Sequence, residues 1–536
     1  MSPQILRDYN KSFLFRFILA CLSGGIYVLS FSPLCFWWLT PVCIVVLYSS
    51  FVHATSLKSS VLIFFTFCAS VMLSASLWIV SAMHSFTGVP SVWLMISVCL
   101  FFSFVIALLL PGFVLSFALE HSPLAFAASF AVSEYLRSHY AVGGTWFSFG
   151  YSQTPPSPLS VWAPIVGMNG INFIMIFFCA SFYRAVFMRE GIFRRSILFL
   201  VFVVLSALLG GISWTHKIVG SSHKVLLVQP NLPVASVSDD IPLTLSRVIL
   251  RYQLLMSNYS SADWVVFPEA GIPFTVDEPA DAFWGNLTKQ LFHNFHQTPY
   301  LISGVHQRAD GHYYNAMVLV NPHGRVDGVY HKSFLLPLGE YQWPWLRFFL
   351  NPWLSKIRSY SPGGSNQPPM FVDKEIIAGH ICYENAFSDY VRDRGEAATI
   401  LLSMSNDAWF GRSAAPHMHF QVGQMRSLEN GRPTLFVSNT GPTGYIGVDG
   451  EAKFLPLFQP AVLETVVSGY KGKTPFQMFH GDTGVLFASL MCLVVLSVQR
   501  MRKLGYQLPL FTNSRNLSDS SFAATSSDFC GTDEDE

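Results

Sequence analysis

The sequence predicts a multi-pass α-helical membrane domain joined to a layered α/β domain that lies outside the membrane. Its 536 residues are 51% hydrophobic and only 12% charged, about half the charged fraction of a soluble protein. Most ionisable residues fall between His216 and Asp482, and long apolar runs flank this region on both sides. The net charge of +1 provides no general basic field, so we expect no nucleic-acid partner.

Seven apolar runs precede the polar region, and each has the length and composition of a bilayer-crossing helix. They cover residues 13–31, 36–52, 61–80, 92–119, 123–136, 161–182 and 196–214. An eighth run, 483–498, follows the polar region. The fifth run gives the weakest signal, because it is short and carries Glu134 and Arg137 near its end.

Lys and Arg residues in the short loops indicate the orientation of these helices. Arg7 and Lys11 precede the first run, Lys58 follows the second, and four Arg residues between 184 and 195 surround the turn between the sixth and seventh. An N-terminus in the cytoplasm places all of them inside. Seven crossings then leave the polar domain outside, and the eighth returns the chain to basic residues at 500, 502 and 503.

We therefore divide the chain into four parts. A membrane domain with seven transmembrane helices covers residues 1–215, the polar domain 216–482, the eighth transmembrane helix 483–500 and a cytoplasmic tail 501–536. The tail is rich in Ser and ends in four acidic residues. We expect it to be disordered, because its apolar surface is too small to offset the entropy of ordering.

The polar domain alternates short apolar runs typical of strands with longer runs typical of helices. The predicted strands cover 224–229, 264–267, 300–304, 316–321, 376–382, 400–405 and 434–438, and the predicted helices cover 243–257 and 419–429. This alternation predicts a layered α/β domain that is large enough to have its own core.

Cys382 follows one of these predicted strands. Seven of the nine cysteines lie in or directly beside apolar runs, and Cys382 alone lies in the polar domain. It therefore has no partner there for a disulfide, which favours a chemical role. Strand ends are where α/β folds hold reactive side chains. The alternative is a buried structural cysteine, since a free cysteine often behaves as a small hydrophobe.

Glu269 and Lys332 also follow strand-like runs of the polar domain. A thiol nucleophile needs a proton acceptor, and the tetrahedral intermediate needs a positive group near its oxyanion. Glu269, Lys332 and Cys382 could supply these three functions. Taken separately, a Glu or Lys after a strand is more often a solvated end residue, and sequence spacing does not reveal whether the three converge.

These three segments resemble the Glu-Lys-Cys triad of the nitrilase, or carbon-nitrogen hydrolase, superfamily. Further matching stretches are 146–153, 267–273, 330–341, 381–384, 405–411 and 426–433. Together with the eight apolar runs, they resemble the apolipoprotein N-acyltransferase family. The resemblance implies an α-β-β-α sandwich for the polar domain, and a bacterial inner-membrane protein with this domain on the periplasmic side. It implies no metal and no cofactor.

The resemblance also implies a two-step acyl transfer. Cys382 would take an acyl chain from a phospholipid as a thioester and pass it to the α-amine of diacylglyceryl-cysteine at an apolipoprotein N-terminus. Glu269 would be the base, and Lys332 would stabilise the oxyanion. Glu340, Tyr383 and Glu384 match positions that support the site in this family. We expect Glu384 to pair with Lys332, or else to form an ordinary surface salt bridge.

Two further segments bear on how lipid substrates would be contacted. The family tends to carry a Trp about ten residues after Gln229, and residues 234–239, around Ser238, contain none. This departure from the family concerns the contacts to the acyl chain or the lipoprotein, and not the triad. The aromatic segment 341–353 is interpreted as a lid facing the outer leaflet, because acyl chains must leave the bilayer without crossing water; a buried core loop is the alternative.

Two other functions are alternatives for this sequence. A membrane-tethered amidase could use the same triad with water as the acceptor, although a hydrolase needs only one helix as a tether. A transporter or receptor is disfavoured because few ionisable residues fall inside the predicted crossings.

Overall fold

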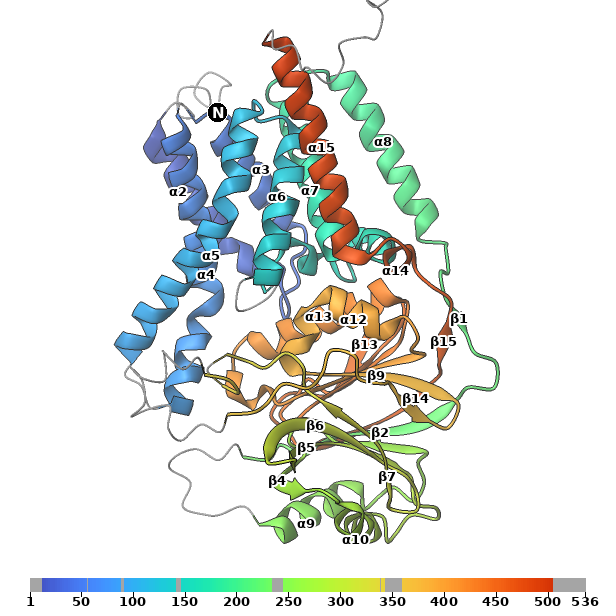
Figure 1. Cartoon of the computed structure of the whole chain (residues 1–536). Coiled ribbons are helices and arrows are strands. Elements are labelled where there is room, and N and C mark those ends of the chain that lie inside the picture. The colour runs from blue at the N-terminus through green and yellow to red at the C-terminus, as the bar shows by residue number, and fades with distance from the viewer. Residues whose placement is uncertain are drawn as a thin grey trace, which may run out of the picture.

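The computed structural model describes residues 12–54, 56–87, 91–140, 146–233, 244–337, 339–342 and 359–504. A helical bundle lies against one side of an α/β domain (Figure 1). The segment around Ser238, the aromatic segment beyond Gln342 and the tail beyond Leu504 lie outside the described residues. The expectations about them therefore remain predictions.

Eight helices occupy the positions of the eight predicted crossings. They are α2 (Phe13–Tyr27), α3 (Leu39–Val52), α4 (Leu57–Thr87), α5 (Ser91–Ala118), α6 (Pro123–Tyr140), α7 (Ala163–Val186), α8 (Ile192–Leu209) and α15 (Gly481–Lys503). Within the described residues, α2, α4, α7, α8 and α15 are long and apolar enough to cross a membrane. Helix α8 has no buried residue although it is strongly apolar, which suits a helix surrounded by lipid. The chain is a multi-pass membrane protein.

The first sheet of the α/β domain has seven strands. Its order is β14 (Ala461–Val467), β2 (His223–Gln229), β3 (Trp264–Val266), β5 (Tyr300–Ala309), β6 (His312–Val320) and β7 (Val326–His331), and β4 (Ile272–Asp277) also pairs with β5. Strands β2, β3 and β5 run parallel. The hairpin strands β6 and β7 extend the sheet in antiparallel pairing.

The second sheet has six strands in the order β13 (Ala452–Phe454), β12 (Gly444–Ile446), β11 (Thr434–Ser438), β10 (Ile400–Ser405), β9 (Glu375–Ile381) and β8 (Met370–Val372). Its three central strands, β9 to β11, are parallel. Their carboxyl ends therefore meet at one edge of the sheet. A short ladder joins β1 (His216–Lys217) to β15 (Tyr470–Lys471).

The two sheets pack face to face between helices. In β2, Leu226 and Val228 face helices α9 (Leu245–Met256) and α10 (Asp281–Leu291), whereas Val225 and Leu227 pack against the second sheet. This alternation follows from the two-residue period of a strand. Helices α12 (Ser388–Gly395) and α13 (Ala415–Asn430) cover the other face of the second sheet. The α-β-β-α sandwich implied by the resemblance is therefore present (Figure 1).

Helix α13 joins the sandwich to the bundle. Its Met418, Val422 and Met425 belong to the same buried cluster as side chains of α2, α3, α4 and α7. The carboxylate of Glu429 accepts a 2.9 Å hydrogen bond from the backbone N–H of Met168, next to the kink of α7 where Gly167 has a φ of 64°. The second sheet is thus fixed relative to the helical bundle through α13.

Segment 146–153 is rich in aromatic residues. Phe147, Phe149 and Tyr151 are buried in the cluster that α13 shares with the bundle. They serve mainly as core side chains.

Candidate active site

Cys382 follows the last residue of β9 and begins a short 3-10 turn, Cys382–Ala386. Its φ is 51°, in the left-handed region that costs a non-glycine residue roughly 1–2 kcal/mol. Hydrogen bonds hold the backbone on both sides. The N–H of Ile381 donates to Glu384 Oε2 over 2.7 Å, and the carbonyl oxygen of Cys382 lies 3.1 Å from His419 Nε2. The side chain is partly exposed.

Glu269 lies just beyond β3, on the first sheet, and only 8% of it is exposed. Its Oε1 accepts a 2.6 Å hydrogen bond from the side chain of Asn315, a residue of β6. Its Oε2 accepts a 2.8 Å hydrogen bond from the backbone N–H of Asn406, just after β10. The carboxylate is therefore fixed between the two sheets at their shared edge.

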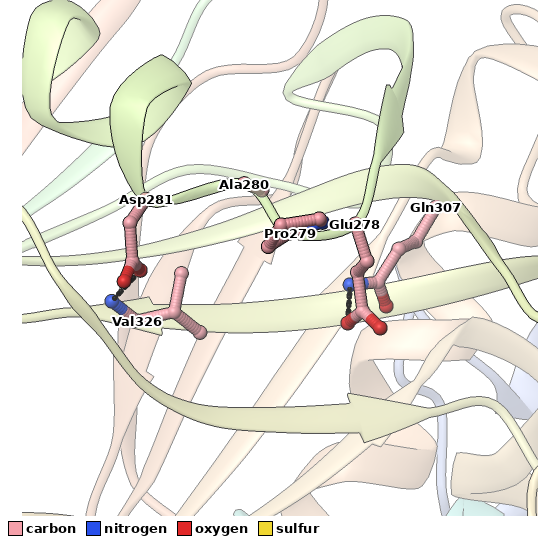
Figure 2. A pocket seen from close by; sticks show the side chains of 6 residues that line it. All are labelled: Glu278, Pro279, Ala280, Asp281, Gln307 and Val326. Carbon is pink, nitrogen blue, oxygen red and sulfur yellow. Dashed lines mark hydrogen bonds between the residues drawn. The ribbon is translucent and has the colours of Figure 1, made fainter.

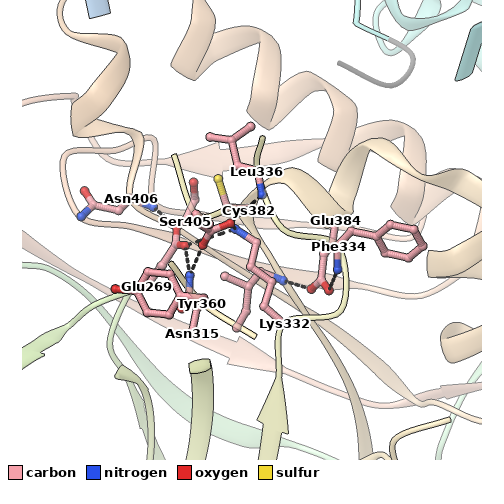
Figure 3. Close-up of polar contacts among 12 residues, drawn as sticks. Glu269, Asn315, Lys332, Phe334, Leu336, Tyr360, Cys382, Glu384, Ser405 and Asn406 are labelled. Atoms are coloured by element: carbon pink, nitrogen blue, oxygen red, sulfur yellow. Dashed lines mark hydrogen bonds and ion pairs between the residues drawn. The ribbon is translucent and has the colours of Figure 1, made fainter. Parts of the chain in front are cut away.

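Lys332 follows β7 and is 1% exposed. Its Nζ lies 2.8 Å from Glu340 Oε2 and 3.5 Å from Glu269 Oε1. The Asn315 side chain also donates to Glu340, over 2.6 Å, so one amide links both carboxylates that flank the ammonium group. Figure 3 shows the side chains of Cys382, Glu269 and Lys332 gathered in one cluster.

Burial and charge set the protonation of this cluster. Burial raises the pKa of Glu269, and the nearby Glu340 raises it further, while Lys332 opposes both. Burial alone would lower the pKa of Lys332, but Glu340 and Glu269 together raise it. Lys332 therefore stays charged, and Glu269 is a stronger base than an ordinary carboxylate.

The thiol is not activated in advance. Burial and then the charge of Glu269 raise the pKa of Cys382 well above that of an ordinary cysteine, and Lys332 only partly compensates. The resting group is a neutral thiol, so a nucleophilic role would require a base that takes its proton. The arrangement suits general-base catalysis at the thiol rather than a preformed thiolate.

Glu384 differs from expectation. Among the described residues, its carboxylate forms no ion pair with Lys332, whose ion-pair partners are Glu269 and Glu340. Instead, Glu384 is fully buried and accepts hydrogen bonds from the Tyr330 hydroxyl and from the backbone N–H groups of Ser333, Phe334 and Ile381. The expected pairing was wrong because backbone donors saturate this carboxylate. It ties the segment after Lys332 to the residue before Cys382.

Glu340 and Tyr383 lie near the triad in different ways. Glu340 is the direct ion-pair partner of Lys332 and also accepts from the backbone N–H of Leu336 over 2.7 Å. Tyr383 is buried, and its ring packs edge-on against Phe387 with 5.0 Å between centroids.

Sequence reasoning missed Asn315, Asn406, Asp407 and His419. Asn315 interrupts an otherwise apolar strand and is 3% exposed. A buried amide in such a run needs a hydrogen-bond partner, and this requirement is the signal that could have identified it.

A separate open pocket of about 420 Å³ lies at β4, lined by Glu278, Pro279, Ala280, Asp281, Gln307 and Val326. Both of its carboxylates already have partners, because Asp281 accepts from the Val326 N–H over 3.0 Å and Glu278 accepts from Gln307 (Figure 2). None of the triad residues lines it. We assign no chemistry to this pocket.

Comparisons with known proteins match both halves of the chain. The family model described as "Apolipoprotein N-acyltransferase N-terminal domain" matches residues 23–181, and "Carbon-nitrogen hydrolase" matches residues 224–466. The apolipoprotein N-acyltransferases of Photobacterium profundum and Shewanella oneidensis are each 30% identical. The first match covers 92% of this chain and 98% of the relative, and the second covers 91% and 96%.

Solved structures of the carbon-nitrogen hydrolase superfamily also match. A protein from Xanthomonas campestris has a TM-score of 0.35 at 16% identity, with 54% of this chain and 98% of that chain covered. A carbon-nitrogen hydrolase from Helicobacter pylori has a TM-score of 0.34 at 13% identity, with 55% and 99% covered.

Proposed function

Because the chain belongs to the apolipoprotein N-acyltransferase family, we propose that Glu269, Lys332 and Cys382 carry out its acyl transfer. The protein is an acyltransferase whose catalytic part is a carbon-nitrogen hydrolase domain. The observation that carries the assignment is the position of Lys332. It is a buried cation that lies 2.8 Å from Glu340 and 3.5 Å from Glu269, and Cys382 is among the groups whose charge raises the pKa of Lys332.

In the first half-reaction, the thiol sulfur attacks an ester carbonyl of the acyl donor while Glu269 takes the thiol proton. The C–S bond forms, and negative charge develops on the carbonyl oxygen, where the Lys332 ammonium stabilises it. Collapse of the intermediate breaks the C–O bond. The departing lysolipid oxygen takes the proton from Glu269, which leaves an acyl thioester on Cys382.

In the second half-reaction, an α-amine attacks the thioester carbonyl and Glu269 accepts the amine proton. The C–N bond forms, the C–S bond breaks, and the proton returns to the sulfur of Cys382. The same base and the same cation serve both half-reactions, because each half-reaction passes through a tetrahedral intermediate at the acyl carbonyl carbon, with negative charge on its oxygen. Glu340 keeps Lys332 charged throughout, and Glu384 holds the backbone around it.

We propose a phospholipid as the donor and a diacylglyceryl apolipoprotein as the acceptor. The basic loops support an inner-membrane protein with its catalytic domain, residues 216–482, on the periplasmic side. Residues 1–215 and 483–500 would then form the membrane part, with the tail 501–536 in the cytoplasm. Contact of α13 with the bundle favours this division, because it places the catalytic sheet next to the membrane helices.

The test uses the full chain in vesicles of phosphatidylethanolamine and phosphatidylglycerol labelled in their acyl chains. A synthetic diacylglyceryl-cysteine peptide is added as acceptor, and a peptide with an acetylated amine is the control. The proposal predicts N-acyl peptide only from the free amine, with little free fatty acid. Release of fatty acid at the same rate with either peptide would instead indicate a membrane-tethered hydrolase.

A further inference from the structure

A buried His–Asp pair contacts the backbone of Cys382 and takes no part in the steps above. His419 lies in α13 and is 2% exposed, and Asp407 begins a 3-10 turn, Asp407–Phe410, and is fully buried. His419 Nδ1 lies 2.9 Å from Asp407 Oδ1, and its Nε2 lies 3.1 Å from the carbonyl oxygen of Cys382. The imidazole thus bridges the carboxylate and the nucleophile's own peptide group.

The topology explains how the two residues reach Cys382. Strands β9 and β10 are parallel, with Met404 level with Ile381. The segments that follow these strands therefore leave the sheet side by side, one carrying Cys382 and the other Asp407. Helix α13 packs over this edge and brings His419 into contact with both.

The partners of the ring define its hydrogen bonding. A carbonyl oxygen can only accept, so Nε2 must carry the hydrogen that it donates to Cys382. Asp407 Oδ1 also accepts a 2.5 Å hydrogen bond from the Ser405 hydroxyl. The same oxygen lies 2.9 Å from Nδ1 of His419, so Asp407 contacts the ring at the nitrogen that does not face Cys382. The ring is thereby oriented at both ends.

Aromatic side chains surround the same ring. Phe436 of β11 lies 5.3 Å away edge-on, and Phe410 lies 6.5 Å away. Trp146, from the segment that precedes the 3-10 helix η2 (Phe149–Gln153) in the membrane part, lies 5.9 Å away with 33° between the planes. The ring has little freedom to turn, so its bond to Cys382 is fixed in direction.

We propose that His419, held by Asp407, is a positioning residue that fixes the Cys382 backbone and thereby aims the thiol. The left-handed conformation of Cys382 is unfavourable for a residue with a side chain, so it persists only where the surroundings hold it. The carbonyl carbon and Cβ are both bonded to Cα, so fixing the carbonyl group fixes the direction of the Cα–Cβ bond that carries the thiol. The inference rests on Cys382 being the nucleophile, as proposed above.

Two substitutions of His419 distinguish the proposed positioning role from a role in filling the core. In His419→Gln, the side-chain amide can still donate to the Cys382 carbonyl from near the position of Nε2. In His419→Asn, the shorter amide replaces Nδ1 and keeps the bond to Asp407, but it does not reach Cys382. His417→Asn is the matched control, because it lies on the same helix, is only partly buried and has no hydrogen bond to Cys382 among the described residues.

The readouts are the rate of Cys382 alkylation by iodoacetamide, followed by mass spectrometry of its peptide, the kcat and KM for thioester formation, and Tm. We expect His419→Asn to slow alkylation and lower kcat by at least about 10-fold, because the thiol is misplaced, with KM within about twofold of wild type. His419→Gln should recover most of the loss, and His417→Asn should match wild type.

Three results would overturn the inference. One is wild-type alkylation in His419→Asn. Another is an equal fall in alkylation rate and kcat in the Asn and Gln variants, with equal falls in Tm. This result would mean that His419 only fills the core. If His419→Asn does not fold, the third is a large fall in alkylation rate and kcat in a His419→Gln variant that does fold. Absence of any thioester on wild-type Cys382 would instead contradict the proposed function, so the two failures are distinguishable.

Discussion

Lys332 and Glu340 form a buried ion pair, with 2.8 Å between Nζ and Oε2, whereas the nearest Glu269 oxygen lies 3.5 Å from the same nitrogen. The cation therefore has a closer partner than the residue proposed as base. Glu340 can balance the charge of Lys332 while Glu269 gains and loses a proton. The following predictions depend on this division of roles.

Glu340→Gln should change the pH dependence of the reaction. The charge of Glu340 raises the pKa of both Glu269 and Lys332, so its removal lowers both. Glu269 must be deprotonated to act, hence the loss of rate on acidification should move to lower pH. We expect kcat at neutral pH to fall by about 10–100-fold because the base is weaker and Lys332 is less well placed. A pH–rate profile of thioester formation checks this. If the acid limb of the profile, where the rate falls on acidification, lies at the same pH as in wild type, the prediction is contradicted.

Asn315→Leu should move the same acid limb in the opposite direction. The Asn315 hydrogen bond lowers the pKa of Glu269, and its loss raises that pKa. Activity then disappears at a higher pH as the solution is acidified. The unsatisfied carboxylates should also cost about 1–3 kcal/mol in the free energy of unfolding. Profiles of the two variants measured side by side are the test, and shifts of the same sign would show that the contacts of Glu269 have been misassigned.

Lys332→Met and Glu269→Gln should each reduce the rate of both half-reactions by at least about 100-fold, with substrate binding largely kept. Methionine is a long, unbranched side chain of similar shape without the charge of lysine, so the oxyanion loses its cation. Glutamine keeps the shape of Glu269 but cannot take the thiol proton. Single-turnover rates with labelled donor measure the effect. Near-normal rates in either variant would contradict the catalytic role proposed for that residue.

Glu384→Gln should act through the fold. Its carboxylate accepts four hydrogen bonds from donors on both sides of the site, and an amide nitrogen would face some of those donors. We expect about 1–3 kcal/mol of destabilisation and reduced kcat, with the acid limb at its wild-type pH. A shifted acid limb would mean that Glu384 instead tunes the charge of the triad.

Much of the architecture could be predicted from the sequence, because it depends on local patterns. The strands that carry Glu269 and Cys382 are short apolar runs, and the bilayer crossings are long ones. The partners within the site could not be predicted, because pairing in space does not follow from spacing. Glu384 was expected to bind Lys332, but its carboxylate accepts hydrogen bonds from the backbone N–H groups of Ile381, Ser333 and Phe334 instead. His419 lies 37 residues from Cys382 in sequence, and only the packing of α13 brings them together.

The central claim is that Cys382 carries the acyl chain between donor and acceptor, and a trapped intermediate tests it most directly. The full chain is incubated with acyl-labelled phospholipid without acceptor, and the protein is then analysed by peptide mass spectrometry with and without hydroxylamine, with Cys382→Ala as the control. We predict one hydroxylamine-sensitive acyl group on the Cys382 peptide, absent in the variant and transferred when diacylglyceryl-cysteine peptide is added. Full acyl transfer by Cys382→Ala, or a label on another residue that moves to the acceptor, would contradict the claim.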